Sequence, residues 1–217
     1  MSTQESPARP DSVPTRERRS DATTNHKALL HAAQAVLAEN PQASLDTIAQ
    51  AASLSRRALY GHFPDRETLL KEVIALGAER FNAIADVIED TDPRVALARL
   101  AVRLWREASA VRAAANIALS EAHVAETVRS LAPLRRRVRE LSNAGIAAGV
   151  FRRDVSPEVL AILIEETARA TLRQTRLDAE SGPSAIARVV LSIAGLSWTE
   201  QAELRRSGYE DLIPAGI

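Results

Sequence analysis

Apolar residues recur at helical spacing along most of this chain. Between residues 25 and 40 they fall on one face of a helix, at Leu29, Ala33, Val36 and Leu37. Asn40 and Pro41 end this pattern, because proline cannot continue a helix. Two short apolar segments follow, each behind a serine that can act as an N-cap: Ser44 before residues 45–52, and Ser55 before residues 56–62. The pattern predicts two short helices joined by a break at Ser53 and Leu54.

The helical period continues toward the C-terminus. Asp65 can cap a long helix that runs to about residue 90, and Asp92 with Pro93 marks the start of another. Pro133 and Ser156 with Pro157 open two more, the second over about residues 157–179. Gly182 and Pro183 break the chain before a strongly apolar helix at 186–196, and residues 200–206 can add a short one. No segment alternates apolar and polar residues over a useful strand length, so we expect an all-α fold.

Composition excludes several kinds of protein. Cysteine is absent, which rules out disulfides, a thiolate nucleophile and a cysteine-based zinc site. No apolar run approaches the ~20 residues that a membrane-spanning helix needs, and the N-terminal residues lack the apolar core of a signal peptide. We therefore expect a cytoplasmic protein without a membrane partner.

The first 24 residues differ from the rest. They are rich in proline, serine and threonine, and they predict a disordered arm over residues 1–24. Arg16, Arg18 and Arg19 form a small basic cluster in this arm. Two interpretations stay open: a solvated tail, or an arm that reaches the backbone or minor groove of DNA.

The two short helices and the long helix after them have the layout of a helix-turn-helix unit. In such a unit the first short helix braces the second, which presents side chains to the major groove. Small and apolar residues suit the brace, at Ile48, Ala49, Ala52, Leu54 and Leu59. The outward residues of the second helix include Arg56 and Arg57, and arginine can bind guanine with two hydrogen bonds. Because the formal net charge is zero, any DNA contact must come from such a local patch.

Each of these residues also has an ordinary structural interpretation. Tyr60 can be a core aromatic residue, and His62 can be favoured by the dipole at a helix C-terminus. Arg56 and Arg57 can form a solvated face.

The segment from Asp46 to Leu70 resembles the DNA-binding signature of the TetR family of bacterial transcription regulators. The resemblance lies in Ile48-Ala49, Ala51-Ala52, the block Leu59-Tyr60-Gly61-His62-Phe63-Pro64, and Leu69-Leu70. It implies a repressor that is released from a pseudo-palindromic operator by a small effector, and the aliphatic composition favours a lipophilic one. We expect DNA contacts from Ser44, Ser55, Arg56, Arg57, Ala58, Tyr60, His62 and Arg66. Two residues depart from the family pattern: Ser53 replaces a turn glycine, and Arg57 replaces a small residue.

The resemblance divides the chain into parts. Residues 25–66 form the helix-turn-helix domain, which a long helix at about 66–90 connects to an effector-binding and dimerisation domain at 91–197. Residues 198–217 form a C-terminal tail. In the family the last two apolar helices form a homodimer, and a helix that is apolar on several faces does need several partners. We expect the interface at Ile162, Leu163, Glu166, Val190 and Ile193.

Effector contacts are expected among the middle helices, where the family binds its ligands. The candidates are Trp105, Arg112, Asn116, Glu121 and His123. Simple core packing of Trp105 and a surface position of His123 are the alternatives. Because aromatic residues are few, the pocket should be mainly aliphatic.

Enzymatic activity is not expected. The histidines His26, His31, His62 and His123 lack the spacing of a metal site, and the chain has neither a phosphate-binding glycine loop nor a nucleophile elbow. We expect no catalytic residue, no metal and no cofactor apart from an unidentified small-molecule effector. The expected partners are double-stranded DNA, a second copy of the chain and that effector. The alternative is a helical scaffold that binds proteins and lacks sequence-specific DNA binding.

Overall fold

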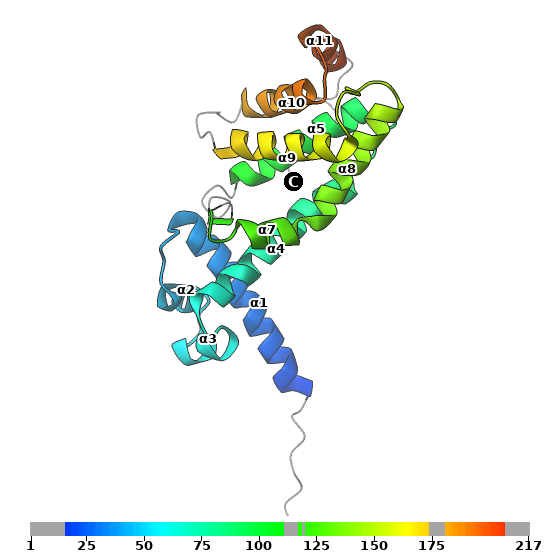
Figure 1. Cartoon of the computed structure of the whole chain (residues 1–217). Helices are drawn as coiled ribbons and strands as arrows, with labels where there is room; N and C mark the ends of the chain where they lie inside the picture. The colour runs from blue at the N-terminus through cyan, green and yellow to red at the C-terminus, as the bar shows by residue number, and fades with distance from the viewer. Residues whose placement is uncertain (1–15, 111–116, 119, 174–180, 207–217) are drawn as a thin grey trace, which may run out of the picture.

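The computed structural model describes residues 16–110, 117–118, 120–173 and 181–206. Within them the chain is all-helical, as predicted (Figure 1). The first helices are α1 (Arg16–Glu39), α2 (Leu45–Ala51), α3 (Arg56–His62) and α4 (Arg66–Asp86). The others are α5 (Pro93–Ala110), α7 (Val124–Ser130), α8 (Ala132–Ala147), α9 (Pro157–Arg173), α10 (Ser181–Ile193) and α11 (Trp198–Arg206).

Two hydrophobic cores organise these helices. The first lies under α1, α2, α3 and the start of α4, and its fully buried members include Leu29, Ile48, Leu59 and Phe63. The second joins α5, α8, α9 and α10, and α5 packs most extensively against α10. Figure 1 shows α4 running from α2 and α3 at one end of the molecule toward α8 and α5 at the other. Helix α4 is thus the element shared by both cores.

Helix α1 begins earlier than the sequence predicts. It starts at Arg16, whereas a disordered arm was expected through residue 24. The prolines of the N-terminal segment end at Pro14, and the residues from Arg16 to Thr24 include neither proline nor glycine. Nothing in that stretch therefore interrupts a helix that the apolar face after Asn25 already stabilises.

Helix α10 also begins earlier than predicted. Gly182 and Pro183 do not break the chain before the helix but lie in its first turn, which begins at Ser181. Proline is tolerated there because the first N–H groups of a helix have no partner within it. A Cβ on Gly182 would lie 1.9 Å from Cζ2 of Trp105, so glycine lets that indole pack against the helix.

The C-terminal segment contains the predicted short helix. It is α11, which starts at Trp198, slightly before the predicted Glu200. In the part of the chain that the structure describes, no helix is long and apolar enough to cross a membrane.

Candidate nucleic-acid interface and internal cavity

Three side chains cap the helices around α3, as the sequence predicts. The Oγ of Ser44 accepts a hydrogen bond from the backbone N–H of Thr47 at 3.1 Å, at the start of α2. The Oγ of Ser55 accepts one from Ala58 at 3.1 Å, at the start of α3. Asp65 caps α4 by accepting from Thr68 at 2.7 Å, and this bond lowers the pKa of the Asp65 carboxyl. Each cap satisfies a helix N–H that would otherwise have no partner.

The turn between α2 and α3 is tight. Ser53 has a φ of +57°, the left-handed conformation that favours glycine. The N–H of Leu54 donates to the carbonyl of Ala49 at 2.9 Å, which closes the end of α2. The turn therefore keeps its geometry with a Cβ present, as expected from the serine at this position.

The outer face of α3 is basic and exposed. Arg56 and Arg57 are both exposed, and the Nε of Arg56 lies 3.0 Å from Oδ1 of Asp46 on α2. The guanidinium of Arg56 also lies over the Tyr60 ring, 5.6 Å from its centre. Tyr60, and then Asp46, raise the pKa of Arg56. Because Tyr60 is 42% exposed, it is not a core residue. This face presents cationic groups next to an aromatic one, which is suited to phosphates and base edges.

The inner face of α3 is anchored to α1 and α4. The ring of His26 stacks on the fully buried Phe63 with 4.8 Å between centres, and its Nε2 lies 2.7 Å from Oε2 of Glu72. His62 approaches His26 edge-on at 5.6 Å. His62 is half-buried beside this cluster, and Ala58 is half-buried as well. Sequence reasoning missed His26 and Glu72, although His26 shares a helical face with Leu30 and Ala33 of the core.

The side chain of Arg66 is half-buried and has partners within its own domain. Its two terminal nitrogens donate to the backbone carbonyls of Ala43 at 2.5 Å and Pro41 at 2.7 Å. These carbonyls lie between α1 and α2, where the chain has left its helical hydrogen bonding, so they need outside donors. Arg66 therefore fixes this connection against α4, and its expected phosphate contact stays a prediction.

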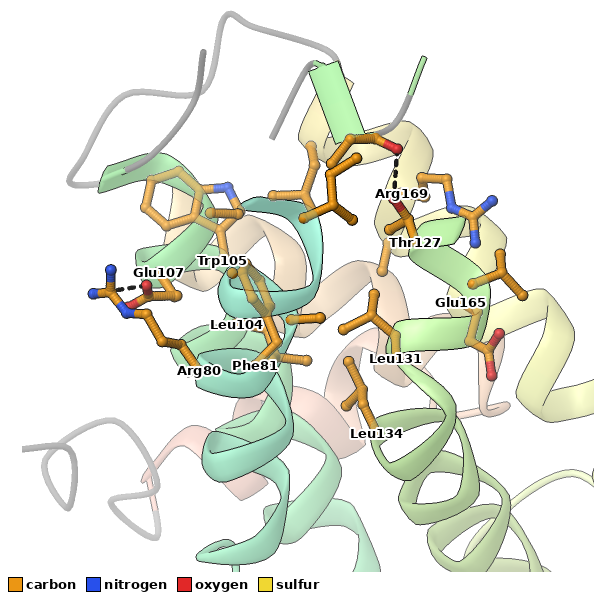
Figure 2. Close-up of a pocket in the computed structure, with 18 of the residues that line it drawn as sticks. Arg80, Phe81, Leu104, Trp105, Glu107, Thr127, Leu131, Leu134, Glu165 and Arg169 are labelled. Atoms are coloured by element: carbon orange, nitrogen blue, oxygen red, sulfur yellow. Dashed lines mark hydrogen bonds and ion pairs between the residues drawn. The ribbon is translucent and has the colours of Figure 1, made fainter. Parts of the chain in front are cut away.

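A cavity of about 480 Å³ lies inside the molecule. It is lined by residues from α1, α4, α5, α7, α8, α9 and α10, and its wall is mainly apolar. Figure 2 shows Phe81, Leu104 and Trp105 on one side and Leu131 and Leu134 on the other. This volume lies within the range of about 300–1,000 Å³ typical of small-molecule sites.

The charged groups of the cavity wall are paired. Arg80 lies 2.8 Å from Glu107, and the Nε of Arg135 lies 2.7 Å from Glu165. Oε1 of Glu107 is buried and its contact with Arg80 lacks hydrogen-bond alignment, so this pair is held by charge alone. Arg169 also lines the cavity, and its guanidinium lies 3.3 Å from the carboxylate of Glu166, which is not part of the wall. Figure 2 places Arg80 and Glu107 across the apolar region from Glu165 and Arg169.

The predicted effector residues have different positions. Trp105 is buried and lines the cavity. Glu121 is exposed and His123 is buried, and neither is part of the cavity wall. His123 directly precedes α7, and its Nδ1 lies 3.8 Å from Oε1 of Glu67 on α4. It therefore lies where α7 contacts α4, outside the cavity wall. Arg112 and Asn116 lie outside the described residues.

The predicted interface residues differ in their exposure to solvent. Ile162 and Leu163 on α9 are 51% and 38% exposed, and Glu166, one turn further on, is exposed too. Val190 is 1% exposed because the inner face of α10 packs on α5, so it belongs to the core of its own chain. Ile193 is half-buried. The exposed apolar face is therefore mainly on α9, where Val159 extends it.

No metal site is present in the part of the chain that the structure describes. There, no three histidine or acidic side chains lie close enough together to hold an ion.

The helix-turn-helix region matches a known family. Residues 29–73 match the family described as "Bacterial regulatory proteins, tetR family". No curated protein sequence is significantly similar to the chain.

Solved structures share the fold over most of the chain at low sequence identity. RolR in complex with resorcinol is 21% identical, with a TM-score of 0.68, over 91% of this chain and 99% of that one. The fatty acid degradation regulator FadR from Bacillus halodurans is 20% identical, with a TM-score of 0.66, over 77% of this chain and 94% of that one. FadR from Bacillus subtilis in complex with stearoyl-CoA is 17% identical, with a TM-score of 0.65, over 78% and 98%.

Proposed function

This chain carries the DNA-binding domain of the TetR family of transcriptional regulators, and we propose that it is a repressor released from DNA by a small apolar effector. The observation that carries the proposal is the pairing of an exposed basic face on α3 with an apolar cavity in the same chain. The family's regulators are not enzymes, and the chain is accordingly a binding protein.

Helix α3 is proposed to enter the major groove. Arg56 and Arg57 are the base-reading candidates, and Tyr60 is placed to contact the backbone. Ser44 and Ser55 are exposed at the starts of α2 and α3, where helix N-termini attract phosphate. His62 and Ala58 are half-buried, and the ring of His62 also contacts His26 of α1, so we propose smaller DNA contacts from these two residues than from the exposed ones.

A homodimer is proposed to hold two such helices at the correct spacing. The exposed apolar residues Val159, Ile162 and Leu163 of α9 support a contact with a second copy, since a solvated helix face rarely carries three large apolar side chains. Two recognition helices about 34–36 Å apart would meet successive major grooves of a pseudo-palindrome.

The cavity is the proposed effector site. RolR is described with resorcinol and the B. subtilis FadR with stearoyl-CoA, so regulators of this fold bind ligands of quite different size. In this chain the apolar wall and the paired charges favour a lipophilic ligand without a charge of its own at the centre. Effector binding would favour a conformer in which the two α3 helices are wrongly spaced, and DNA affinity would then fall.

The test is selection of duplexes from a random DNA pool, followed by fluorescence anisotropy with the enriched sequence. The proposal expects a two-fold symmetric sequence, and binding that weakens steeply with salt because phosphate contacts release counterions. The double variant R56A/R57A should lose this binding, while R205A/R206A, on the distant α11, should retain it. The absence of any enriched sequence would favour the protein-binding scaffold.

A further inference from the structure

The cavity lies where one core ends and the other begins. Along α4, Val73 belongs to the first core and Ala85 to the second. Between them, Gly77 and Phe81 line the cavity. An occupant of the cavity would therefore touch α4 at the junction between the two halves of the molecule.

Gly77 has no structural need to be glycine. It lies in the interior of α4, where glycine costs about 1 kcal/mol relative to alanine, and a Cβ built on it meets no atom within 4 Å. Gly145 and Gly182 differ, because a Cβ there would collide with Phe151 or Trp105. The missing side chain at Gly77 therefore leaves open space inside the cavity, and no neighbouring atom packs into that space.

Helix α1 forms the wall near this junction. Its contribution has helical spacing, at His31, Gln34, Ala35, Leu37 and Ala38. Leu37 is 1% exposed and also belongs to the first core, together with Leu59 and Phe63 beneath α3. A single helix thus faces the cavity on one side and supports the recognition helix on the other.

We propose that Gly77 opens the cavity onto α1, so that the bound effector contacts the DNA-binding domain directly. The wall offers an apolar surface together with the amide of Gln34 and the ring of His31, while its arginines are paired with glutamates. The effector is therefore an apolar molecule with an uncharged hydrogen-bonding group at its α1 end. This inference rests on the proposed function, and it names α1 as the element through which the effector acts.

A side chain that grows from Gly77 should mimic the effector. G77L would fill part of the cavity from α4 without any ligand, and A38L would fill part of it from α1. A168L, on α9 in the other core, removes a similar volume at a distance from α1 and is the matched control. G77A adds one methyl group to open space in a helix, so it should melt at a higher temperature than the wild type.

The experiment compares DNA affinity and dye binding in these variants. It uses the full chain with W198F, which leaves Trp105 in the cavity wall as the single tryptophan. The probe is N-phenyl-1-naphthylamine, a neutral apolar dye, followed by energy transfer from Trp105. DNA affinity is measured by anisotropy on the enriched duplex, and circular dichroism with thermal melting confirms the fold. G77L and A38L should each weaken DNA binding at least about tenfold without dye, which is within the usual range of allosteric coupling. A168L should weaken dye binding and leave DNA affinity within about twofold of wild type.

Two results would overturn the inference and leave the proposed function standing. One is a folded G77L or A38L protein with wild-type DNA affinity. The other is an equal loss of DNA affinity in A168L, which would mean that any filling of the cavity has the same effect wherever it occurs. If the wild-type chain binds none of the duplexes, the proposed function itself fails, and the inference fails with it.

Discussion

The core beneath α3 and the core beneath α9 differ in how completely they are filled. In the first, Leu29, Ile48, Leu59 and Phe63 are fully buried, and side-chain caps fix the starts of α2, α3 and α4. The second is larger and also well buried, yet its residues form much of the apolar wall of the cavity of about 480 Å³, which the buried residues of the first core reach only through Leu37 and Val73. Reading DNA requires side chains held at fixed positions, whereas sensing a ligand requires room and the ability to adjust. The tightly filled core thus supports the DNA-reading helix, the core with open space is suited to a ligand, and α4 belongs to both.

The largest expected effect comes from opening the tight core. F63A removes a fully buried ring that packs against His26, and such truncations cost about 3–5 kcal/mol. Trp105 belongs to the second core and Trp198 begins α11, and neither is part of the first core, so tryptophan fluorescence follows the second core. In denaturant titrations F63A should lose part of its helical signal well before the fluorescence changes, and its DNA binding should be abolished.

The control for this variant is V190A in the other core, which should shift the fluorescence transition instead. If the two signals of F63A stay coincident, the two cores unfold as one unit and the comparison is wrong.

The next effect tests the exposed face of α9. I162D places a charge in the proposed dimer contact, where an interface anchor is worth roughly 2 kcal/mol or more. Sedimentation should show a shift from dimer to monomer, and DNA affinity should fall because the two α3 helices are no longer linked. E203A on α11 is a suitable surface control. If I162D remains as dimeric as the wild type, the dimer interface does not include this face of α9.

The same difference between the halves decided how far the sequence could be interpreted. The caps Ser44, Ser55 and Asp65, and the Ser53 turn, are local features, so spacing alone predicted them correctly. The position of Arg66 could not be predicted, because its partners Pro41 and Ala43 are distant in sequence. Likewise, periodicity shows that Val190 is apolar but not whether α5 or a second chain covers it. The cavity depends on seven helices meeting in space, and among the predicted effector residues that the structure describes, Trp105 lines it while Glu121 and His123 do not.

A smaller effect is expected on the DNA-reading face. R57A should cost about 1–3 kcal/mol of affinity for the enriched duplex if Arg57 reads a base, and the loss should be confined to one position of the sequence. If Arg57 instead contacts phosphate, affinity should fall evenly across sequences and the salt dependence should become shallower. Anisotropy on a panel of single-base variants, at several salt concentrations, separates these outcomes. D46A is an informative companion, because it frees Arg56 from its ion pair and should strengthen non-specific binding.

The smallest effect concerns the cap that begins α4. The pKa of Asp65 is lowered, first by the hydrogen bond from the backbone N–H of Thr68, so folding favours the ionised carboxylate. A lowered folded pKa means that this stabilisation is present above the unfolded value of about 3.9 and is lost as the pH falls through the folded pKa. In D65N the side chain still caps the helix but carries no charge. The melting temperature of D65N should therefore lie slightly below that of the wild type at pH 7, and the two should begin to converge as the pH falls below about 4. Asp92 and Glu200 in the other half also have lowered pKa values and destabilise both proteins equally in acid, so only the difference between the two melting curves is informative. A difference that stays constant between pH 7 and pH 3 would show that the charge of Asp65 does not contribute, and that geometry alone holds the start of α4.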